Sequence, residues 1–250
     1  MEGQLLQGRR ALVTGSSGGI GAHIAVALAR AGADVAVNYR TNPDGAEQVA
    51  SRIRCCGRRA LVLHADVTRR ADCLYLVRET VEQLGSIDIL INNAGEFAYK
   101  RCRDHTPEEF DRIIASTVGA TFTCSMAALD HMRQTGWGRI VNLGAAGAER
   151  AGSRKNCGPH MAGKAGVVAL ARTLAVEEAS FGITFNVVCP GIIKDRDLSR
   201  AEAQTMTDPM APVGRPGTSE DVVDAVMFLV SPQASYVNGA VISVTGGWEV

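Results

Sequence analysis

The stretch Thr14-Gly15-Ser16-Ser17-Gly18-Gly19-Ile20-Gly21 separates a short apolar run at residues 11–13 from an amphipathic segment that extends to residue 31. This order predicts a strand, a glycine-rich turn and a helix. Glycine lets the backbone approach a phosphate closely, and a helix N-terminus presents free N–H groups and the positive end of the helix dipole. Glycines also occur in tight turns that need a positive φ. Here a strand precedes the turn and a second strand follows the helix, which favours nucleotide binding.

Apolar runs and runs with helical periodicity alternate along the rest of the chain. Several apolar runs lack polar alternation, which indicates strands with helices on both faces. We therefore predict an α/β fold, a Rossmann-type doubly wound parallel sheet in one domain over residues 1–250, with an irregular lid at about 191–217. The expected strands are residues 11–14, 35–39, 60–64, 87–91, 139–143, 183–188 and 241–244, and the expected helices are residues 20–31, 44–55, 71–84, 107–133, 160–180 and 219–230.

The composition bounds the classes of function. The 250 residues carry no formal net charge and no long basic block, which gives nucleic-acid binding no electrostatic support. Residues 1–10 lack the apolar core of a signal peptide, and the most apolar stretch, 165–176, contains Arg172 and is too short to span a membrane. The seven cysteines are scattered without metal-binding spacing, so we expect reduced thiols, no metal site and a cytoplasmic protein.

Polar residues follow three of the expected strands. Arg40 ends the second strand, where an acidic residue would bind the ribose hydroxyls of NAD; an arginine there favours the 2′-phosphate of NADP(H), or it is simply solvated. Asp66 and Val67 follow the third strand, and Asn92-Asn93-Ala94-Gly95 follows the fourth. Ligands of open α/β sheets bind at these carboxyl ends of strands. An aspartate in such a turn also caps helices, so Asp66 alone does not decide between the two roles.

Together these motifs resemble the short-chain dehydrogenase/reductase family, in particular reductases of 3-oxoacyl thioesters of acyl carrier protein or coenzyme A. The glycine turn, Asp66-Val67, residues 92–95, Pro190-Gly191 and Val244-Thr245-Gly246-Gly247 stand in the family's order over nearly the whole chain. In the lid, Asp195 stands where the family usually has threonine, and its charge is unfavourable near a pyrophosphate. The resemblance implies a cofactor site made by Gly15, Ser17, Gly19, Ile20, Gly21, Arg40, Asp66, Val67, Asn93, Ala94, Gly95, Lys164, Pro190, Gly191 and Ile193.

The residues for carbonyl reduction differ from the family. The resemblance implies a tyrosine that donates a proton, a lysine four residues later that holds the ribose, a serine that polarises the carbonyl and an asparagine that helps to place a water. Here the Tyr-x-x-x-Lys motif is His160-x-x-x-Lys164, the serine position is Ala145 and the asparagine position is Thr117. A positioned general acid contributes roughly 10²–10⁴-fold and a carbonyl donor roughly 10²–10³-fold, so a reductase without both should be very slow.

Three interpretations follow. The first is a non-catalytic, structural or regulatory subunit. The resemblance implies dimers or tetramers formed through the helices at 107–133 and 160–180 and the C-terminal strand. The partner would be a second copy of this chain or a catalytically intact homologue that acts on a hydroxyacyl or oxoacyl thioester. The second is an enzyme with a changed mechanism: an NADP(H)-dependent oxidoreductase with His160 as acid/base and Lys164 on the ribose, or a non-redox enzyme that uses the same pocket. An imidazolium is an adequate acid near neutral pH, but its ring is shorter than a phenol and Lys164 disfavours its charge. The third is a sensor that binds NADP(H) and signals through a partner, whereas a purely structural subunit need not retain the cofactor.

Overall fold

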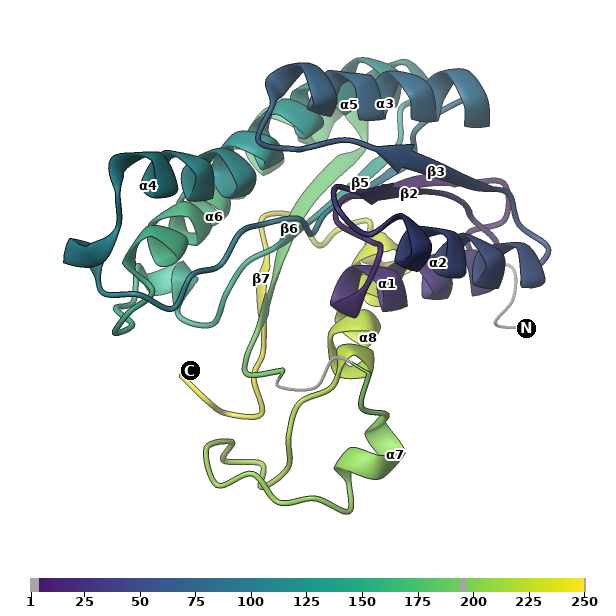
Figure 1. The fold of residues 1–250 in the computed structure, drawn as a ribbon. Helices are drawn as coiled ribbons and strands as arrows, with labels where there is room; N and C mark the ends of the chain where they lie inside the picture. Colours follow the sequence, from purple (N-terminus) through teal and green to yellow (C-terminus); the bar gives the residue numbers. More distant parts are fainter. Residues whose placement is uncertain (1–4, 194–196, 250) are drawn as a thin grey trace.

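The computed structural model describes residues 5–193 and 197–249, and its centre is a seven-stranded parallel sheet (Figure 1). The strand order is β3-β2-β1-β4-β5-β6-β7, so the chain builds outward from β1 to β3 and then returns to β4 on the other side of β1. This confirms the predicted doubly wound sheet and puts the reversal of winding between β1 and β4. The strands are β1 (Arg10–Val13), β2 (Asp34–Tyr39), β3 (Ala60–His64), β4 (Ile89–Asn92), β5 (Gly138–Leu143), β6 (Ile183–Pro190) and β7 (Val241–Val244).

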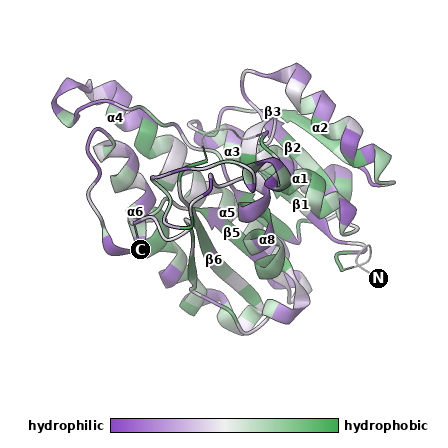
Figure 2. Cartoon of the chain, turned by 90° about the horizontal axis from the view of Figure 1, so that it is seen from below, coloured by the Kyte–Doolittle hydropathy of each residue, from purple (hydrophilic) through white to green (hydrophobic). Residues whose placement is uncertain are grey.

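Helices cover both faces of the sheet, because successive strand residues point to opposite sides. Val13 and Ile91 pack toward α1, α2 and α8, whereas Leu12 and Leu90 pack toward α3, α5 and α6. Figure 1 shows these two helix layers, and Figure 2 shows hydrophobic residues along β6 between them. The helices are α1 (Gly19–Arg30), α2 (Pro43–Cys55), α3 (Arg70–Leu84), α4 (Pro107–Ile114), α5 (Ala120–Thr135), α6 (Gly158–Glu178), α7 (Arg200–Ala203) and α8 (Ser219–Val230).

The helix expected at 107–133 consists of α4 and α5 with a π-helical turn, Ala115–Gly119, between them. Its start follows the sequence signals: Thr106 and Glu109 form a capping box, and Pro107 occupies the first turn. The periodicity alone did not predict the π-helical turn. Such turns are frequent at functional sites, and this one contains Thr117, the position at which the family resemblance implies an asparagine.

Other boundaries also differ from the expectations. The strand expected at 87–91 begins at Ile89 and extends to Asn92, and the helix expected at 160–180 begins at Gly158 and ends at Glu178. The lid is not wholly irregular, because it contains the short helix α7, which begins with a capping box between Ser199 and Glu202. In Figure 1 the lid projects beyond the carboxyl edge of the sheet.

Within the described residues, one helical stretch, Pro107–Thr135, is long and apolar enough to cross a membrane by length and composition. Half of its apolar window is buried inside the protein, and core helices of soluble proteins meet the same test, so this is weak evidence for a span. This stretch differs from residues 165–176, which the sequence indicated as the most apolar. All seven cysteines are free thiols, and no group of three or more His, Cys, Asp or Glu side chains in the described part of the chain could hold a metal ion.

Candidate functional site

The glycine-rich turn connects β1 to α1 at the carboxyl edge of the sheet, beside the reversal point. Gly15 and Gly19 have φ values of 61° and 57°, which residues with a Cβ rarely adopt. A Cβ on Gly21 would lie 2.5 Å from Asn93 Nδ2 and 2.7 Å from the Gly15 carbonyl oxygen, so the turn accommodates only glycine there. Gly18 is the N-cap of α1, and no side chain caps this helix. The N-terminus of α1 is therefore available to an anion.

Three polar side chains hold the turn against the neighbouring strands. Asn93 Nδ2 donates to the carbonyl oxygens of Thr14 and Gly15, both at 2.9 Å. Thr14 Oγ1 accepts from the N–H groups of Asn93 at 3.0 Å and Ala94 at 3.1 Å, and Asn38 Oδ1 accepts from the Gly15 N–H at 2.9 Å. Sequence reasoning gave Thr14 and Asn38 no role in the site, although a polar residue at the end of an apolar strand was the available signal.

The other residues predicted near the turn contact elements on either side of it. The Ser17 carbonyl oxygen accepts from Asn42 Nδ2 at 3.4 Å, which joins the turn to the start of α2. Ile20 packs on the layer of α1, α2 and α8, and Val67 packs on the opposite layer. Gly95 faces Lys164, because a Cβ on Gly95 would lie 3.5 Å from the lysine Nζ. The loop after β4 therefore links the turn to the lysine of α6.

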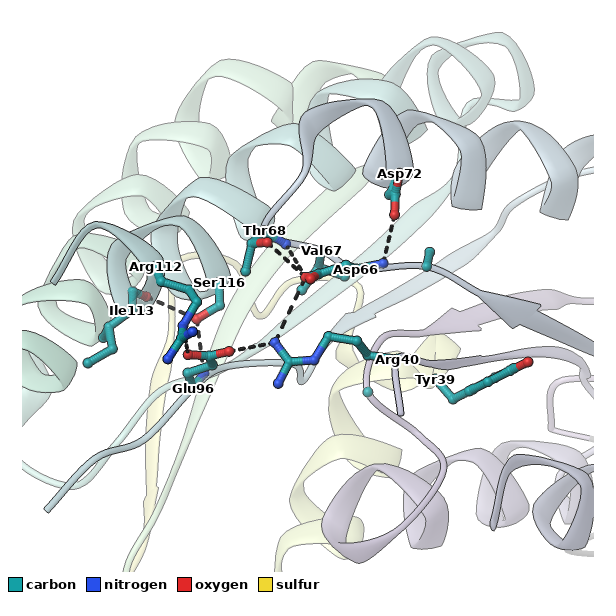
Figure 3. A network of polar contacts seen from close by, with 12 residues as sticks. Tyr39, Arg40, Asp66, Val67, Thr68, Asp72, Glu96, Arg112, Ile113 and Ser116 are labelled. Atoms are coloured by element: carbon teal, nitrogen blue, oxygen red, sulfur yellow. Dashed lines mark hydrogen bonds and ion pairs between the residues drawn. The ribbon is translucent and has the colours of Figure 1, made fainter. Parts of the chain in front are cut away.

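Arg40 extends from the end of β2 along the carboxyl edge of the sheet (Figure 3). Its Nη1 lies 2.5 Å from Glu96 Oε1 and 3.9 Å from Asp66 Oδ1. The hydrogen bond to Glu96, and the charges of both carboxylates, raise the pKa of Arg40 despite its partial burial. The guanidinium predicted to bind a phosphate thus already has anionic partners. Sequence reasoning did not single out Glu96.

Asp66 closes the turn that precedes α3. Its Oδ1 accepts from the Thr68 N–H at 3.0 Å and the Thr68 hydroxyl at 2.8 Å, and its own N–H donates to Asp72 Oδ2 at 2.8 Å. Burial favours the neutral acid, but the hydrogen bonds from Thr68 and the charge of Arg40 hold the pKa of Asp66 below its ordinary value of 3.8. The lowered pKa favours the ionised carboxylate, which closes this turn through Thr68. Asp66 does not cap the following helix, because the N-cap of α3 is Arg69 and no side-chain hydrogen bond caps that helix.

Lys164 lies inside α6 and is buried among its neighbours. Its Nζ donates to the Leu143 carbonyl oxygen at 2.5 Å, at the end of β5. Burial lowers the pKa of Lys164 from 10.5 to about 8. The nearby Cys189 thiol does not supply a counter-charge at neutral pH, because its own burial raises its pKa to about 11.

His160 is held by the same loop that follows β4. Its Nδ1 lies 3.0 Å from the Glu96 carbonyl oxygen, and its ring makes an edge contact with Phe97 at 5.1 Å between centroids. A carbonyl oxygen only accepts, so Nδ1 carries the proton of the neutral ring and Nε2 carries the lone pair. Burial and the charge of Lys164 lower the pKa of His160 to about 4. The predicted effect of Lys164 on His160 is therefore confirmed.

The serine and asparagine positions also have defined surroundings. Ala145 is buried in an apolar cluster with Cys157 and Met161. The Thr117 hydroxyl donates to the Ile113 carbonyl oxygen at 2.6 Å, within its own helix. The first position has no side-chain donor, and the second uses its hydroxyl proton locally.

The residues predicted around the end of β6 are the last residue of that strand and the start of the lid. Pro190 ends β6, and the Gly191 N–H donates to the Val244 carbonyl oxygen at 2.9 Å, which attaches the start of the lid to β7. Ile193 lines a cavity of about 240 Å³ between the lid and the end of β7. Neither catalytic position of α6 lines this cavity. Asp195 lies outside the described residues.

Residues 15–249 match the protein family described as enoyl-(acyl carrier protein) reductase. The chain is 36% identical over 244 residues to the 3-oxoacyl-[acyl-carrier-protein] reductase FabG of Staphylococcus epidermidis, a match that covers 96% of this chain and 98% of FabG. A short-chain dehydrogenase/reductase from Serratia marcescens has the same fold, with a TM-score of 0.88, 34% identity and coverage of 99% of this chain and 100% of that one. A short-chain dehydrogenase from Burkholderia cenocepacia in complex with NADP gives a TM-score of 0.86 and 35% identity over 98% and 99% of the two chains.

The chain belongs to the short-chain dehydrogenase/reductase family. The predicted family and fold are thus confirmed. In this short-chain dehydrogenase/reductase a series of contacts joins the glycine turn to Asn93, Gly95 to Lys164, and Glu96 to His160. The predicted cofactor positions in the glycine turn and after β4 and the α6 positions are therefore neighbours around one loop, whereas Ile193 lines the cavity under the lid.

Proposed function

We propose that this chain is a non-catalytic, structural or regulatory subunit of a short-chain dehydrogenase/reductase complex. The observation that carries this proposal is the contact of His160 with the Glu96 carbonyl oxygen, which takes the Nδ1–H of the ring. Burial and the charge of Lys164 support the neutral ring, because they lower the pKa of His160 to about 4. Roughly one imidazole in a thousand would be charged at pH 7. Its Nε2 therefore offers a lone pair where reduction of a carbonyl requires a proton donor.

The other three positions support the same conclusion. Lys164 donates to the Leu143 carbonyl oxygen, Ala145 lies in an apolar cluster, and Thr117 donates within its own helix. In an oxidoreductase of this family these groups act as a unit around the carbonyl and the cofactor ribose, and catalytic groups that act as a unit lose their effect together. The catalytic tetrad is degenerate under this proposal.

The carboxyl edge of the sheet beside the glycine turn is proposed to bind NADP(H). The uncapped N-terminus of α1 and the glycines at positions 15, 19 and 21 suit a pyrophosphate, and Arg40 supplies the cation expected near a 2′-phosphate. Solved relatives support this choice: besides the Burkholderia protein with NADP, a blue fluorescent protein from a metagenomic library is described in complex with NADPH, with a TM-score of 0.87 and 34% identity over 99% and 100% of the two chains.

The proposed partner is a catalytically intact homologue that carries the serine, tyrosine and lysine. Exposed apolar side chains on the two helices expected at the interface support this choice, namely Phe122 on α5 and Val176 on α6, which are 46% and 81% exposed. The similarity to FabG suggests that the complex acts on a 3-oxoacyl or 3-hydroxyacyl thioester. We propose a cytoplasmic location, where the seven thiols stay reduced.

Affinity purification of the chain from its host, followed by native mass spectrometry, tests the partner. A hetero-oligomer with an intact homologue is expected, and a homo-oligomer alone would overturn the proposal. Phe122→Glu should dissociate the complex because it puts a charge at the interface. Leu74→Glu is the matched control, since Leu74 is also 46% exposed but lies on α3.

Hydride transfer by the isolated chain tests the loss of catalysis. NADPH oxidation at 340 nm with 3-oxoacyl thioesters should not exceed the rate without protein. In the purified complex, His160→Ala should leave turnover unchanged, because the partner performs the chemistry. Robust turnover by the isolated chain would falsify the proposal.

A second candidate is an NADP(H)-dependent oxidoreductase with an altered site. The unprotonated Nε2 of His160 favours this candidate only in the direction of alcohol oxidation. At neutral pH this atom can accept a proton from an alcohol but cannot donate one to a ketone. This candidate predicts that the isolated chain oxidises a hydroxyacyl thioester and that His160→Ala abolishes the reaction. An unaffected His160→Ala variant would exclude it.

A further inference from the structure

The ion pair between Arg40 and Glu96 lies at the carboxyl edge of the sheet, where the winding of the sheet reverses. Arg40 follows β2 and Glu96 lies in the loop after β4, and in the sheet these two strands flank β1 on either side. A direct contact between the two side chains, 2.5 Å from Nη1 to Oε1, must therefore pass over the end of β1, where the glycine turn begins. Figure 3 shows Arg40 reaching across to Glu96.

Glu96 is held in this position by its backbone as well as by its side chain. Its N–H donates to Ser116 Oγ at 3.0 Å, and its carbonyl oxygen accepts from His160 Nδ1 at 3.0 Å. The second carboxylate oxygen accepts from Arg112 Nε at 2.7 Å. Glu96 thus keeps one arginine partner whether or not Arg40 is bound to it.

The guanidinium groups of this network are paired with carboxylates. Two guanidinium groups, Arg40 and Arg112, face two carboxylates, Asp66 and Glu96. Arg40 therefore does not present a free positive charge to an incoming phosphate. A 2′-phosphate that bound Arg40 would displace Glu96 from it and would then lie near the displaced carboxylate, whose like charge repels it.

We propose that Glu96 is a clasp over the dinucleotide site, which must release Arg40 before the 2′-phosphate of NADP(H) can bind, and that it thereby sets the preference between phosphorylated and unphosphorylated nucleotides. This inference rests on the proposed retention of NADP(H). NADH lacks the 2′-phosphate and needs no exchange of partners at Arg40, so the clasp weakens NADPH binding more than NADH binding. Its removal should shift the preference toward NADPH.

The test compares Glu96→Gln with wild type in fluorescence titrations of NADPH and NADH. The variant keeps the backbone contacts of Glu96 and removes only its charge. The matched control is Glu79→Gln, which removes the charge of a glutamate paired with Arg78 on α3. In Glu96→Gln we expect NADPH to bind about tenfold more tightly and NADH less than about threefold more tightly, whereas in Glu79→Gln both affinities stay within about twofold. Thermal melts confirm that all three proteins are folded.

The possible outcomes separate the clasp from the proposed function. If wild type and Glu96→Gln bind NADPH with the same affinity, or if both nucleotides gain equally, the clasp is refuted while cofactor binding stands. If neither protein binds NADPH or NADH at millimolar concentration, the proposed cofactor site fails and the clasp fails with it. A gain confined to NADPH and to Glu96→Gln supports the clasp.

Discussion

Lys164 gives the sharpest test of the structure, because a buried cation makes folding depend on pH. Its ammonium donates to the Leu143 carbonyl oxygen, and burial lowers its pKa from 10.5 to about 8. The unfolded chain therefore holds this proton between pH 8 and pH 10.5, where the folded chain has lost it. Stability rises with pH wherever the unfolded state binds more protons, so wild type should gain stability across this window.

The size of the gain follows from the two pKa values. Each pH unit between them corresponds to about 1.4 kcal/mol, so the interval from 10.5 to about 8 corresponds to about 3 kcal/mol of stability. Wild type lacks this contribution well below pH 8 and has it in full well above pH 10.5. Between pH 7 and pH 10 about 2 kcal/mol of it should be recovered.

The assay is guanidinium chloride unfolding of wild type and Lys164→Met at pH 7 and pH 10. Methionine fills a similar volume without a charge, so the variant lacks the proton-linked contribution. Groups remote from Lys164 titrate in both proteins and cancel in the difference, whereas the Cys189 thiol, whose pKa the charge of Lys164 lowers, does not cancel in full. The free energy of unfolding of wild type minus that of the variant should rise by about 2 kcal/mol from pH 7 to pH 10. Lys155→Met, at an exposed position, controls for the change in net charge.

A constant difference between wild type and Lys164→Met would refute the reasoning. It would mean that the ammonium reaches water in the folded protein and does not end on the Leu143 carbonyl oxygen. A difference that falls with rising pH would be a stronger contradiction, since it would require an anionic partner for Lys164. Neither result would depend on what methionine does to packing, because packing contributes equally at both pH values.

Three further variants test the glycine turn, the positions expected to be catalytic and the N-cap of α8. Gly21→Ala should destabilise the fold by about 1–3 kcal/mol and abolish NADPH binding, because its Cβ would overlap the side-chain amide that holds the turn. Gly18→Ala is the control, because a Cβ at this position has no atom within 4 Å. Thermal melts measure the stability of both variants, and NADPH titration measures their binding. Ala145→Ser combined with His160→Tyr should raise NADPH-dependent reduction of a 3-oxoacyl thioester by at least about 100-fold over the isolated wild type, and an unchanged rate would show that more than these two groups is missing. Thr218→Ala should cost about 1 kcal/mol, read from the denaturant midpoint, because it removes the capping box of α8.

The order and type of the elements could be predicted from the sequence because the sheet is buried on both faces. Its strands are therefore apolar runs, and the helices between them are periodic. The π-helical turn at Ala115–Gly119 was not predicted, since one extra residue in a turn hardly changes the periodicity of a long helix. The lid helix α7 was missed although Ser199 and Glu202 show the spacing of a capping box, because the segment is too short for periodicity to register.

The part of the candidate site that depends on backbone conformation could be predicted from the sequence. The glycine turn and Asn93 are local to two strand ends, and the structure joins them directly. The partner of Arg40 was not predictable in the same way. Glu96 is 56 positions away, and only the strand order, with β1 between β2 and β4, brings the two side chains together. The directions of Lys164 and His160 depend on rotamers of buried side chains, which sequence spacing does not specify.

Glu96 links the nucleotide site proposed at the carboxyl edge of the sheet to His160 on α6. Its side chain holds Arg40, and its carbonyl oxygen holds His160 Nδ1. A movement of the loop after β4 that opened the nucleotide site would therefore also release the proton on Nδ1 from its acceptor, and the tautomer of the histidine would no longer be fixed. A change at Glu96 confined to the side chain leaves this second contact intact. A substitution of the Glu96 side chain should therefore change nucleotide binding, whereas the protonation of His160 depends on the Glu96 backbone.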